Sequence, residues 1–250
     1  MLNIVQRILP EFGTTYGPNG PGPFPAILVL HGSEGGLSGW SHCISMLLAS
    51  HGFLAYPHAY SRGGNAWNAG AIKDIPIDRT ARALNALRNF EFSSDRAGVY
   101  GVSRGGEHAL LLASLLASEK AHNQPDALAA HGPPDVVCGA FDAKRLRDPG
   151  DPGWQEWDPA ERAWTWKGES EDLKPTTSIQ IELYEGPVFL SHGTEDKMWS
   201  VEMTKRLEEK LKNRKSHFEV HYYEGEDHIC RGEADNKHHE LLIQFFKRFL

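Results

Sequence analysis

The chain has 250 residues, of which 40% are hydrophobic and 24% are charged, and its formal net charge at pH 7 is −7. This composition predicts one globular domain over residues 1–250, because no Ser/Gly-rich linker or block of charge divides the chain. The acidic balance and the lack of a basic stripe argue against a nucleic-acid partner. No apolar stretch approaches the roughly 20 residues of a membrane span, so we expect no membrane partner either.

The first half of the chain alternates between strand-like and helix-like segments. Ala26–Leu30 is a continuously apolar run, which is typical of a strand buried on both faces. Apolar residues at helical spacing predict a helix over Trp40–Ser50, and Phe53–Tyr56 is the next predicted strand. Asp74 can cap a helix that extends to residue 90, with Pro76 in its first turn.

The second half continues the alternation. Val99–Val102 is a predicted strand that leads into a helix over Glu107–Ser118. Further strands are predicted at Asp126–Ala130, Val188–Ser191 and Phe218–Tyr222, and further helices at Val201–Lys212 and Lys237–Leu250. Alternating units of this kind predict an α/β fold with a mostly parallel central sheet and helices on both of its faces.

One long segment, Phe141–Glu185, breaks the alternation. It is dense in Pro, Gly, Asp and Trp and has little periodicity, and so long an irregular stretch in a compact domain usually serves function. We call it the excursion. Its tryptophans predict either an apolar lid over a pocket or anchors that hold the excursion to the rim of the sheet. These tryptophans are Trp154, Trp157, Trp164 and Trp166.

The strongest functional signal is the hexapeptide Gly101–Gly106, which has the pattern G-x-S-x-G between a predicted strand and a predicted helix. In that context the pattern indicates a nucleophile elbow with Ser103 at its tip. Such a turn is so tight that the positions two before and two after the serine must be small, as Gly101 and Gly105 are. The first amides of the following helix then point toward the serine, where an oxyanion develops.

A serine hydroxyl needs a base to remove its proton, and the base needs an acid to orient it. In this architecture both follow the serine in the chain, each just after a strand, in the order Ser, acid, His. Asp196 lies in the turn after the Val188–Ser191 strand, and His228 lies in the turn after the Phe218–Tyr222 strand. We therefore predict Ser103 as nucleophile, His228 as base and Asp196 as acid.

Alternatives remain for the acid. Glu195 neighbours Asp196, and Asp135 and Asp142 follow an earlier strand. The oxyanion hole is predicted from two backbone amides, that of Arg104 after the nucleophile and that of Ser33 in the Gly-rich turn after the first predicted strand.

No metal site or cofactor is predicted. The cysteines (Cys43, Cys138 and Cys230) are widely spaced without a C-x-x-C motif, which indicates reduced thiols. Residues 1–10 lack the charged segment and apolar core of a signal peptide, so we expect a cytoplasmic protein. No feature indicates an oligomeric state.

This set of residues resembles the α/β-hydrolase superfamily, near the dienelactone hydrolase group. It is most similar to the catalytic domain of the acyl-CoA thioesterase and bile-acid-CoA:amino-acid N-acyltransferase family. The similar segments are, in chain order, Gly32–Gly36 with Leu47–Phe53, Ile75–Asp78, Gly101–Glu107, Trp166–Gly168, and Gly186–Val188 through Asp196 to Trp199–Ser200. The resemblance implies Trp166 and Trp199 as candidate pocket residues.

The chain departs from that family in two places. The thioesterases carry an N-terminal β-sandwich domain, which the roughly 25 residues before Ala26 are too few to form. The Pro-rich continuation after the catalytic histidine is replaced by Ile229–Glu233. Because the amino-acid-transferring members use cysteine and this chain has Ser103, the resemblance favours hydrolysis over acyl transfer.

The leading hypothesis is a serine hydrolase that cleaves a small-molecule carboxylic ester or thioester through an acyl-enzyme. An acyl-CoA thioesterase, a serine peptidase of the prolyl-oligopeptidase type, and a non-catalytic receptor or scaffold with the same fold are the alternatives. The last is disfavoured because all three candidate catalytic residues are present.

Overall fold

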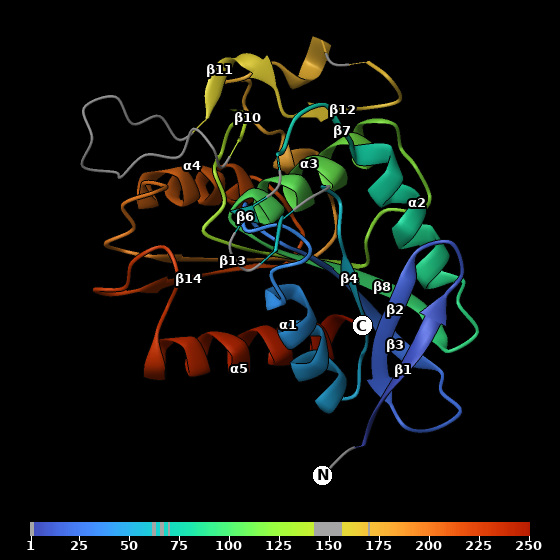
Figure 1. The fold of residues 1–250 in the computed structure, drawn as a ribbon. Helices are drawn as coiled ribbons and strands as arrows, with labels where there is room; N and C mark the ends of the chain where they lie inside the picture. Colours follow the sequence, from blue (N-terminus) through green and yellow to red (C-terminus); the bar gives the residue numbers. More distant parts are fainter. Residues whose placement is uncertain (1–2, 62–63, 66–67, 70, 143–156, 170) are drawn as a thin grey trace.

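The computed structural model describes residues 3–61, 64–65, 68–69, 71–142, 157–169 and 171–250. An eight-stranded sheet runs through its centre (Figure 1). In order across the sheet, its strands are β1 (Ile4–Leu9), β2 (Gly13–Pro18), β4 (Leu54–His58), β3 (Phe24–Leu30), β8 (Ser93–Val102), β9 (Ala127–His131), β13 (Val188–Gly193) and β14 (Phe218–Tyr223). Neighbours from β4 to β14 are parallel, whereas β1 and β2 are antiparallel additions at one edge. The expected mostly parallel sheet is confirmed.

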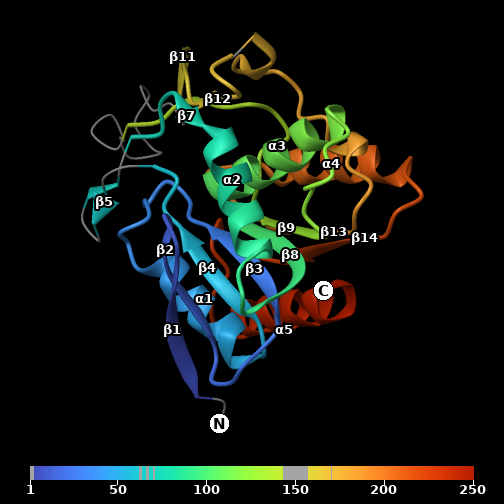
Figure 2. The same ribbon diagram turned by 90° about the vertical axis from the view of Figure 1, so that its right-hand side faces the viewer.

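Helices cover both faces of this sheet. Helices α1 (Trp40–Ser50) and α5 (Gly232–Phe249) pack on one face, in a core that includes Leu48 and Phe246. Helices α2 (Ile77–Arg88), α3 (Arg104–Ser118) and α4 (Val201–Lys212) pack on the other. Figures 1 and 2 show these two layers on either side of the strands. Helix α3 is buried along almost its whole length, as expected of a helix that is apolar on most sides.

The expected start of α2 was wrong. Asp74 does not cap the helix, because its φ of 50° lies in the left-handed region and the helix begins only at Ile77. Ile75–Pro76 instead forms a short strand, β7, which pairs in parallel with β12 (Trp164–Thr165) from the excursion. Residues 75–76 are therefore a strand and not the first turn of a helix, because they pair with residues about 90 positions further along the chain. The hairpin of β1 and β2 was not anticipated either.

Within the excursion, the structure describes residues 141–142, 157–169 and 171–185. Its regular elements are β11 (Asp158–Arg162), β12 and the 3₁₀ helices η2 (Glu171–Leu173) and η3 (Ile181–Leu183), and β11 pairs with β10 (Gly139–Ala140). A further small pair of strands is formed by β5 (Gly64–Asn65) and β6 (Asn68–Ala69). The described part of the excursion lies over the face of the sheet that carries α3 (Figure 1). Trp154 is outside the described residues.

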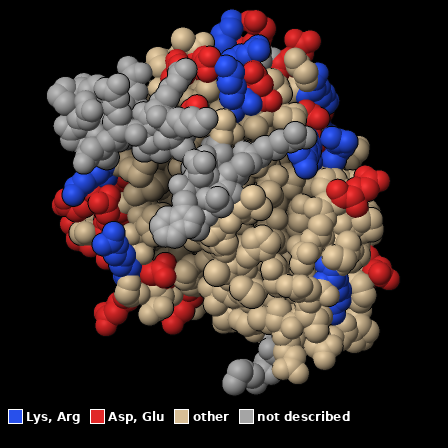
Figure 3. Space-filling model, viewed as in Figure 1, with Lys and Arg blue, Asp and Glu red and all other residues tan. Residues whose placement is uncertain are grey.

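Charge is unevenly distributed over the surface. Residues 12–33 and 35–61, which include α1, β2, β3 and β4, contain no Lys, Arg, Asp or Glu. Figure 3 correspondingly shows a face with few charged side chains. Within the described part of the chain, none of the helices combines the length and apolar character needed to cross a bilayer.

Candidate active site

The parallel strands bring their carboxyl ends to one edge of the sheet. In the register of the sheet, Val102 of β8 pairs with His131 of β9, and His131 pairs with Ser191 of β13. Gly193 of β13 in turn pairs with Tyr223 of β14. The turns that follow these strands therefore meet at one place, which is where open α/β sheets bind ligands.

Ser103 occupies the sharp turn between β8 and α3. Its φ of 55° and ψ of −121° are strained for a residue with a side chain, and such strain gathers at functional sites. The turn depends on small neighbours: a Cβ on Gly101 would lie 2.1 Å from the Gly105 carbonyl oxygen, and one on Gly105 would lie 2.4 Å from that of Leu30. Ser103 is 6% exposed, so little of its side chain reaches solvent.

Asp196 and His228 form a hydrogen-bonded pair at the same edge. The distance from His228 Nδ1 to Asp196 Oδ2 is 2.7 Å, and His192 Nε2 lies 3.0 Å from the same oxygen. The other oxygen, Oδ1, accepts the backbone amides of Met198 and Trp199 at 2.7 and 2.9 Å. Burial alone would raise the pKa of Asp196, but the hydrogen bonds from His192 and His228 and the attraction of His228 outweigh it and hold the pKa below its usual range.

Two further histidines orient this pair, and the sequence analysis did not identify them. His192 donates to Asp196, and His131 Nε2 lies 3.2 Å from the backbone oxygen of His228. Because a carbonyl oxygen only accepts, His131 Nε2 carries the hydrogen, and His131 Nδ1 then accepts from the Ser191 hydroxyl at 2.8 Å. Burial, with repulsion from His228 and His192, lowers the pKa of His131 to about 3, so this ring is neutral. Both histidines lie at the carboxyl ends of strands, at the edge of the sheet where Ser103 lies. That position is the sequence signal that could have identified them.

The Gly-rich turn after β3 lies directly beside Ser103. A Cβ on Gly32 would lie 3.3 Å from the Ser103 Cβ, which brings the predicted amide of Ser33 to the same side of the site. Arg104, which supplies the other predicted amide, is the first residue of α3 and is 1% exposed. The positions of both residues suit backbone donors to an oxyanion.

An acidic side chain that the sequence analysis did not consider lies in the same turn. Glu34 Oε1 accepts the amide of Gly32 at 2.9 Å. Burial raises the pKa of the Glu34 carboxyl, and backbone hydrogen bonds and the attraction of His228 offset only part of that effect. The candidate site therefore contains a second carboxyl group whose ionisation the protein disfavours.

The Ser103 hydroxyl is hydrogen-bonded to Trp199. The indole Nε1 of Trp199 lies 3.1 Å from Ser103 Oγ, and Trp199 is 3% exposed. Within the described residues, no hydrogen bond joins Ser103 Oγ to His228 Nε2. Hydrogen bonds between a base and a nucleophile often tighten only when substrate binds. The structure thus brings Trp199 to Ser103 and His228 to Asp196.

The rival acids are placed differently. Glu195 is exposed, whereas the side chain of Asp196 is fully buried. Asp135 forms a two-pronged ion pair with Arg206, at 2.6 and 2.8 Å.

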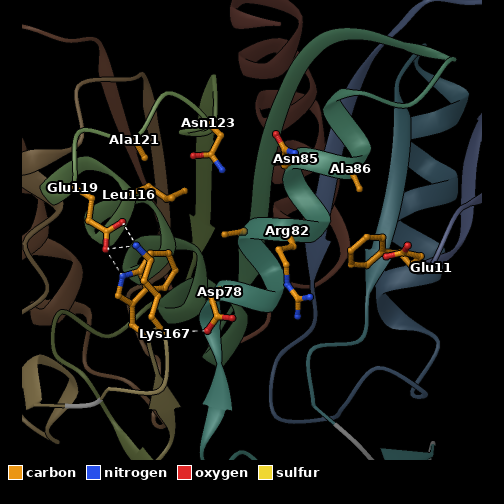
Figure 4. Close-up of a pocket in the computed structure, with 13 residues that line it drawn as sticks. Glu11, Asp78, Arg82, Asn85, Ala86, Leu116, Glu119, Ala121, Asn123 and Lys167 are labelled. Atoms are coloured by element: carbon orange, nitrogen blue, oxygen red, sulfur yellow. Dashed lines mark hydrogen bonds and ion pairs between the residues drawn. The ribbon is translucent and has the colours of Figure 1, made fainter.

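The structure does not bring Trp166 to this group. Its indole donates to Glu119 at 2.7 Å, beyond the far end of α3, which is roughly 22 Å long and begins beside Ser103. Trp166 there lines a pocket of about 510 Å³ between α2, α3 and the β1–β2 turn. Figure 4 shows Glu119 and Lys167 on one side of that pocket and Glu11 on the other. We therefore leave Trp166 out of the candidate site.

The other described tryptophans of the excursion divide between the two expected roles. Trp164 is fully buried and donates to Glu107 at 2.7 Å, which anchors the excursion to α3. Trp157 stacks on Trp199 with ring centroids 5.3 Å apart and planes 21° apart. Trp157 thus packs against the ring that is hydrogen-bonded to Ser103. Among the described residues, no group of three or more His, Cys, Asp or Glu side chains is arranged to hold a metal ion.

Comparison with known proteins gives a family and a fold. The model of the prolyl oligopeptidase family matches residues 60–250, which is more than half of the chain. Acyl-coenzyme A thioesterase 2 of Mus musculus is 35% identical over 104 residues, which cover 41% of this chain and 22% of that protein. The chain therefore aligns with only about a fifth of the length of this curated relative.

Solved structures extend the likeness over the whole chain. A candidate dienelactone hydrolase of Klebsiella pneumoniae superposes with a TM-score of 0.68 at 16% identity and covers 100% of both chains. The butyrate-bound esterase Est2 of Thermogutta terrifontis superposes with a TM-score of 0.63 at 19% identity, over 98% of this chain and 94% of that one. These findings confirm the α/β-hydrolase fold and the expected likeness to dienelactone hydrolases and acyl-CoA thioesterases.

Proposed function

Because the chain belongs to the prolyl oligopeptidase family, we propose that it is a serine hydrolase that cleaves carboxylic esters or thioesters through an acyl-enzyme. One observation carries this proposal. The hydrogen-bonded pair of His228 and Asp196 lies at the sheet edge where Ser103 occupies a strained elbow. A nucleophile, a base and a group that orients the base are the parts that acyl transfer from an ester requires.

In the proposed acylation step, Ser103 Oγ attacks the carbonyl carbon of the substrate while its proton passes to His228 Nε2. The electron pair of the carbonyl bond moves to the oxygen, where the amides of Ser33 and Arg104 stabilise the charge. When that pair returns, the bond to the alcohol or thiol breaks, and the leaving group takes the proton from His228. Asp196 keeps its charge throughout and stabilises the imidazolium.

The proposed deacylation step repeats this sequence with water. His228 removes a proton as the water oxygen attacks the acyl carbon, and the second tetrahedral intermediate collapses with Ser103 Oγ as the leaving atom. The proton on His228 returns to that oxygen, and the free acid departs. His192 and His131 act here as positioning residues, because they contact Asp196 and the His228 backbone rather than the reacting atoms.

The acyl group is expected to lie against the excursion. Trp157 and Trp199 present flat apolar surface next to Ser103, of the kind that lines ligand pockets. An acyl-CoA thioesterase activity is supported by the partial sequence likeness to thioesterases. A peptidase activity is supported by the family itself.

The central test is Ser103→Ala. We expect this substitution to lower kcat on p-nitrophenyl esters by about 10⁶ without unfolding the protein, because the nucleophile is lost. A fluorophosphonate probe, which phosphorylates an activated serine, should label the wild-type chain at Ser103 and leave the variant unlabelled. A well-folded variant with near-normal esterase activity would contradict the assignment.

The substrate class is tested with one panel at equal enzyme concentration. It combines p-nitrophenyl esters of several chain lengths, acyl-CoA thioesters and aminoacyl p-nitroanilides. Preference for the esters supports the proposed esterase, whereas dominant cleavage of the thioesters or the anilides identifies the second or third candidate activity.

A further inference from the structure

The hydrogen bond between Trp199 and Ser103 is not part of the triad scheme. Trp199 Nε1 donates to Ser103 Oγ at 3.1 Å, on the atom that attacks the substrate. An indole N–H can only donate, so the serine oxygen is the acceptor. Both groups are buried, which shields their interaction from water.

Trp199 is held in place through both its backbone and its ring. Its backbone amide donates to Asp196 Oδ1 at 2.9 Å, and its backbone oxygen lies 2.9 Å from His192 Nε2. Its ring is stacked against Trp157. The donor is therefore fixed before substrate arrives, by the candidate acid itself, by His192 and by Trp157, and no reorganisation is needed during the reaction.

We infer that the Trp199 indole N–H is a further catalytic group, which stabilises negative charge on Ser103 Oγ. This inference rests on the proposed function, because it needs Ser103 to be the nucleophile. As the proton leaves Oγ for His228, the acceptor changes from a neutral hydroxyl to an oxygen with anionic character. A hydrogen bond to a charged acceptor is roughly twice as strong as one to a neutral acceptor, so the bond strengthens in the transition state.

The same donor assists both half-reactions. Ser103 Oγ is the attacking atom in acylation and the leaving atom in deacylation, and it carries negative charge in both transition states. The amides of the oxyanion hole act on a different atom, the carbonyl oxygen of the substrate. Because Oγ is common to every substrate, losing the indole N–H should slow all esters by the same factor.

The competing explanation is that Trp199 is only a wall of the acyl pocket. A wall residue acts through the shape of its ring, so its effect depends on the length of the acyl chain. Trp199→Phe separates the two explanations, because phenylalanine keeps an aromatic ring beside Trp157 and removes the donor.

We expect Trp199→Phe to lower kcat/KM about 10- to 100-fold for short and long p-nitrophenyl esters alike. The second-order rate of fluorophosphonate labelling should fall by a similar factor, since that reaction also uses Ser103 Oγ. The matched control is Trp166→Phe, which removes an indole hydrogen bond to Glu119 far from Ser103 and should leave both rates unchanged.

A second variant tests the same inference if phenylalanine at position 199 disturbs the packing around Ser103. Site-specific replacement of Trp199 by 3-benzothienylalanine, which exchanges the N–H for sulfur in a ring of nearly the same shape, should reproduce the uniform loss. Wild-type rates in that variant, or a loss confined to one range of chain lengths, would overturn the inference. Failure of the proposed function is distinguishable, because Ser103→Ala would then retain labelling and activity.

Discussion

Two aspartates that follow neighbouring strands, Asp135 after β9 and Asp196 after β13, differ in what they contact. Asp196 accepts from His228 and His192, whereas Asp135 is paired with the half-exposed guanidinium of Arg206. We expect Asp196→Asn to lower kcat by about 10⁴, because an amide stabilises the wrong tautomer of the imidazole.

Asp135→Asn is the comparison for that variant. It should leave kcat almost unchanged and lower the free energy of unfolding by about 1 kcal/mol or less, since it weakens a partly solvated ion pair. Kinetics on one ester and urea denaturation of both variants measure the two effects. A larger loss of kcat from Asp135→Asn would mean that the acid follows a different strand.

The raised pKa of Glu34 predicts how the stability of the folded protein depends on pH. Because burial raises the pKa of its carboxyl in the folded state, the folded protein holds the Glu34 proton more tightly than the unfolded chain does. The contribution of Glu34 to stability is then fully present below about pH 4.3, the pKa of a glutamate in the unfolded chain. It is lost as pH rises through the higher pKa that Glu34 has in the folded protein. Glu34→Gln keeps the acceptor for the Gly32 amide without the charge.

We therefore expect the melting temperature of Glu34→Gln to exceed that of the wild type by a few degrees at pH 7 and to equal it below about pH 4. Thermal unfolding of both proteins across that range measures the difference. A variant that is less stable at pH 7 would show that the ionised carboxylate is favoured where it lies.

At the scale of elements, the contact of α3 with β3 determines the elbow. A Cβ on Gly105 would lie 2.4 Å from the carbonyl oxygens of Leu30 and His31, which are backbone atoms and cannot rotate away. A Cβ on Gly106 would meet nothing closer than the Pro133 Cβ at 3.2 Å, with the Gly101 carbonyl oxygen at 3.4 Å and the Ala130 Cβ at 3.5 Å. Gly105→Ala should therefore destabilise the protein by about 3 kcal/mol, as a severe overpacking does.

Gly106→Ala is the matched control, because both positions gain the same helix propensity from alanine. It should change the free energy of unfolding by less than about 1 kcal/mol. Chemical denaturation of the two variants provides the comparison, and equal losses would mean that α3 shifts to accommodate either methyl group.

The helices that could be predicted from the sequence are those whose bounds depend on their own residues and not on a distant pairing partner. Helices α1 and α4 begin and end where the apolar spacing indicated, at Trp40–Ser50 and Val201–Lys212. The start of α2 was misplaced because β12, far along the chain, pairs with Ile75–Pro76. The hairpin of β1 and β2 went unrecognised because its strands lie at the sheet edge, where β1 has only one neighbour and exposes every second residue.

At the scale of the whole molecule, the excursion joins distant parts of the chain into one site. It is anchored to α3 through Trp164 and Glu107, and it reaches Ser103 through the stack of Trp157 on Trp199. That the excursion forms one wall of the acyl pocket stays a prediction. The contact explains why a segment without regular periodicity is rich in tryptophan, since large flat rings can pack without regular secondary structure.

The sequence by itself determined the α/β class and the proposed nucleophile, acid and base. These follow from local rules, because a buried parallel strand is continuously apolar and a nucleophile elbow needs small residues at fixed spacing. Only the tertiary structure decided that Trp199 donates to Ser103, that His192 and His131 support Asp196 and His228, and that Trp166 lies at the far end of α3. Those contacts join side chains from different strand ends, and the distance between them depends on the register and twist of the assembled sheet.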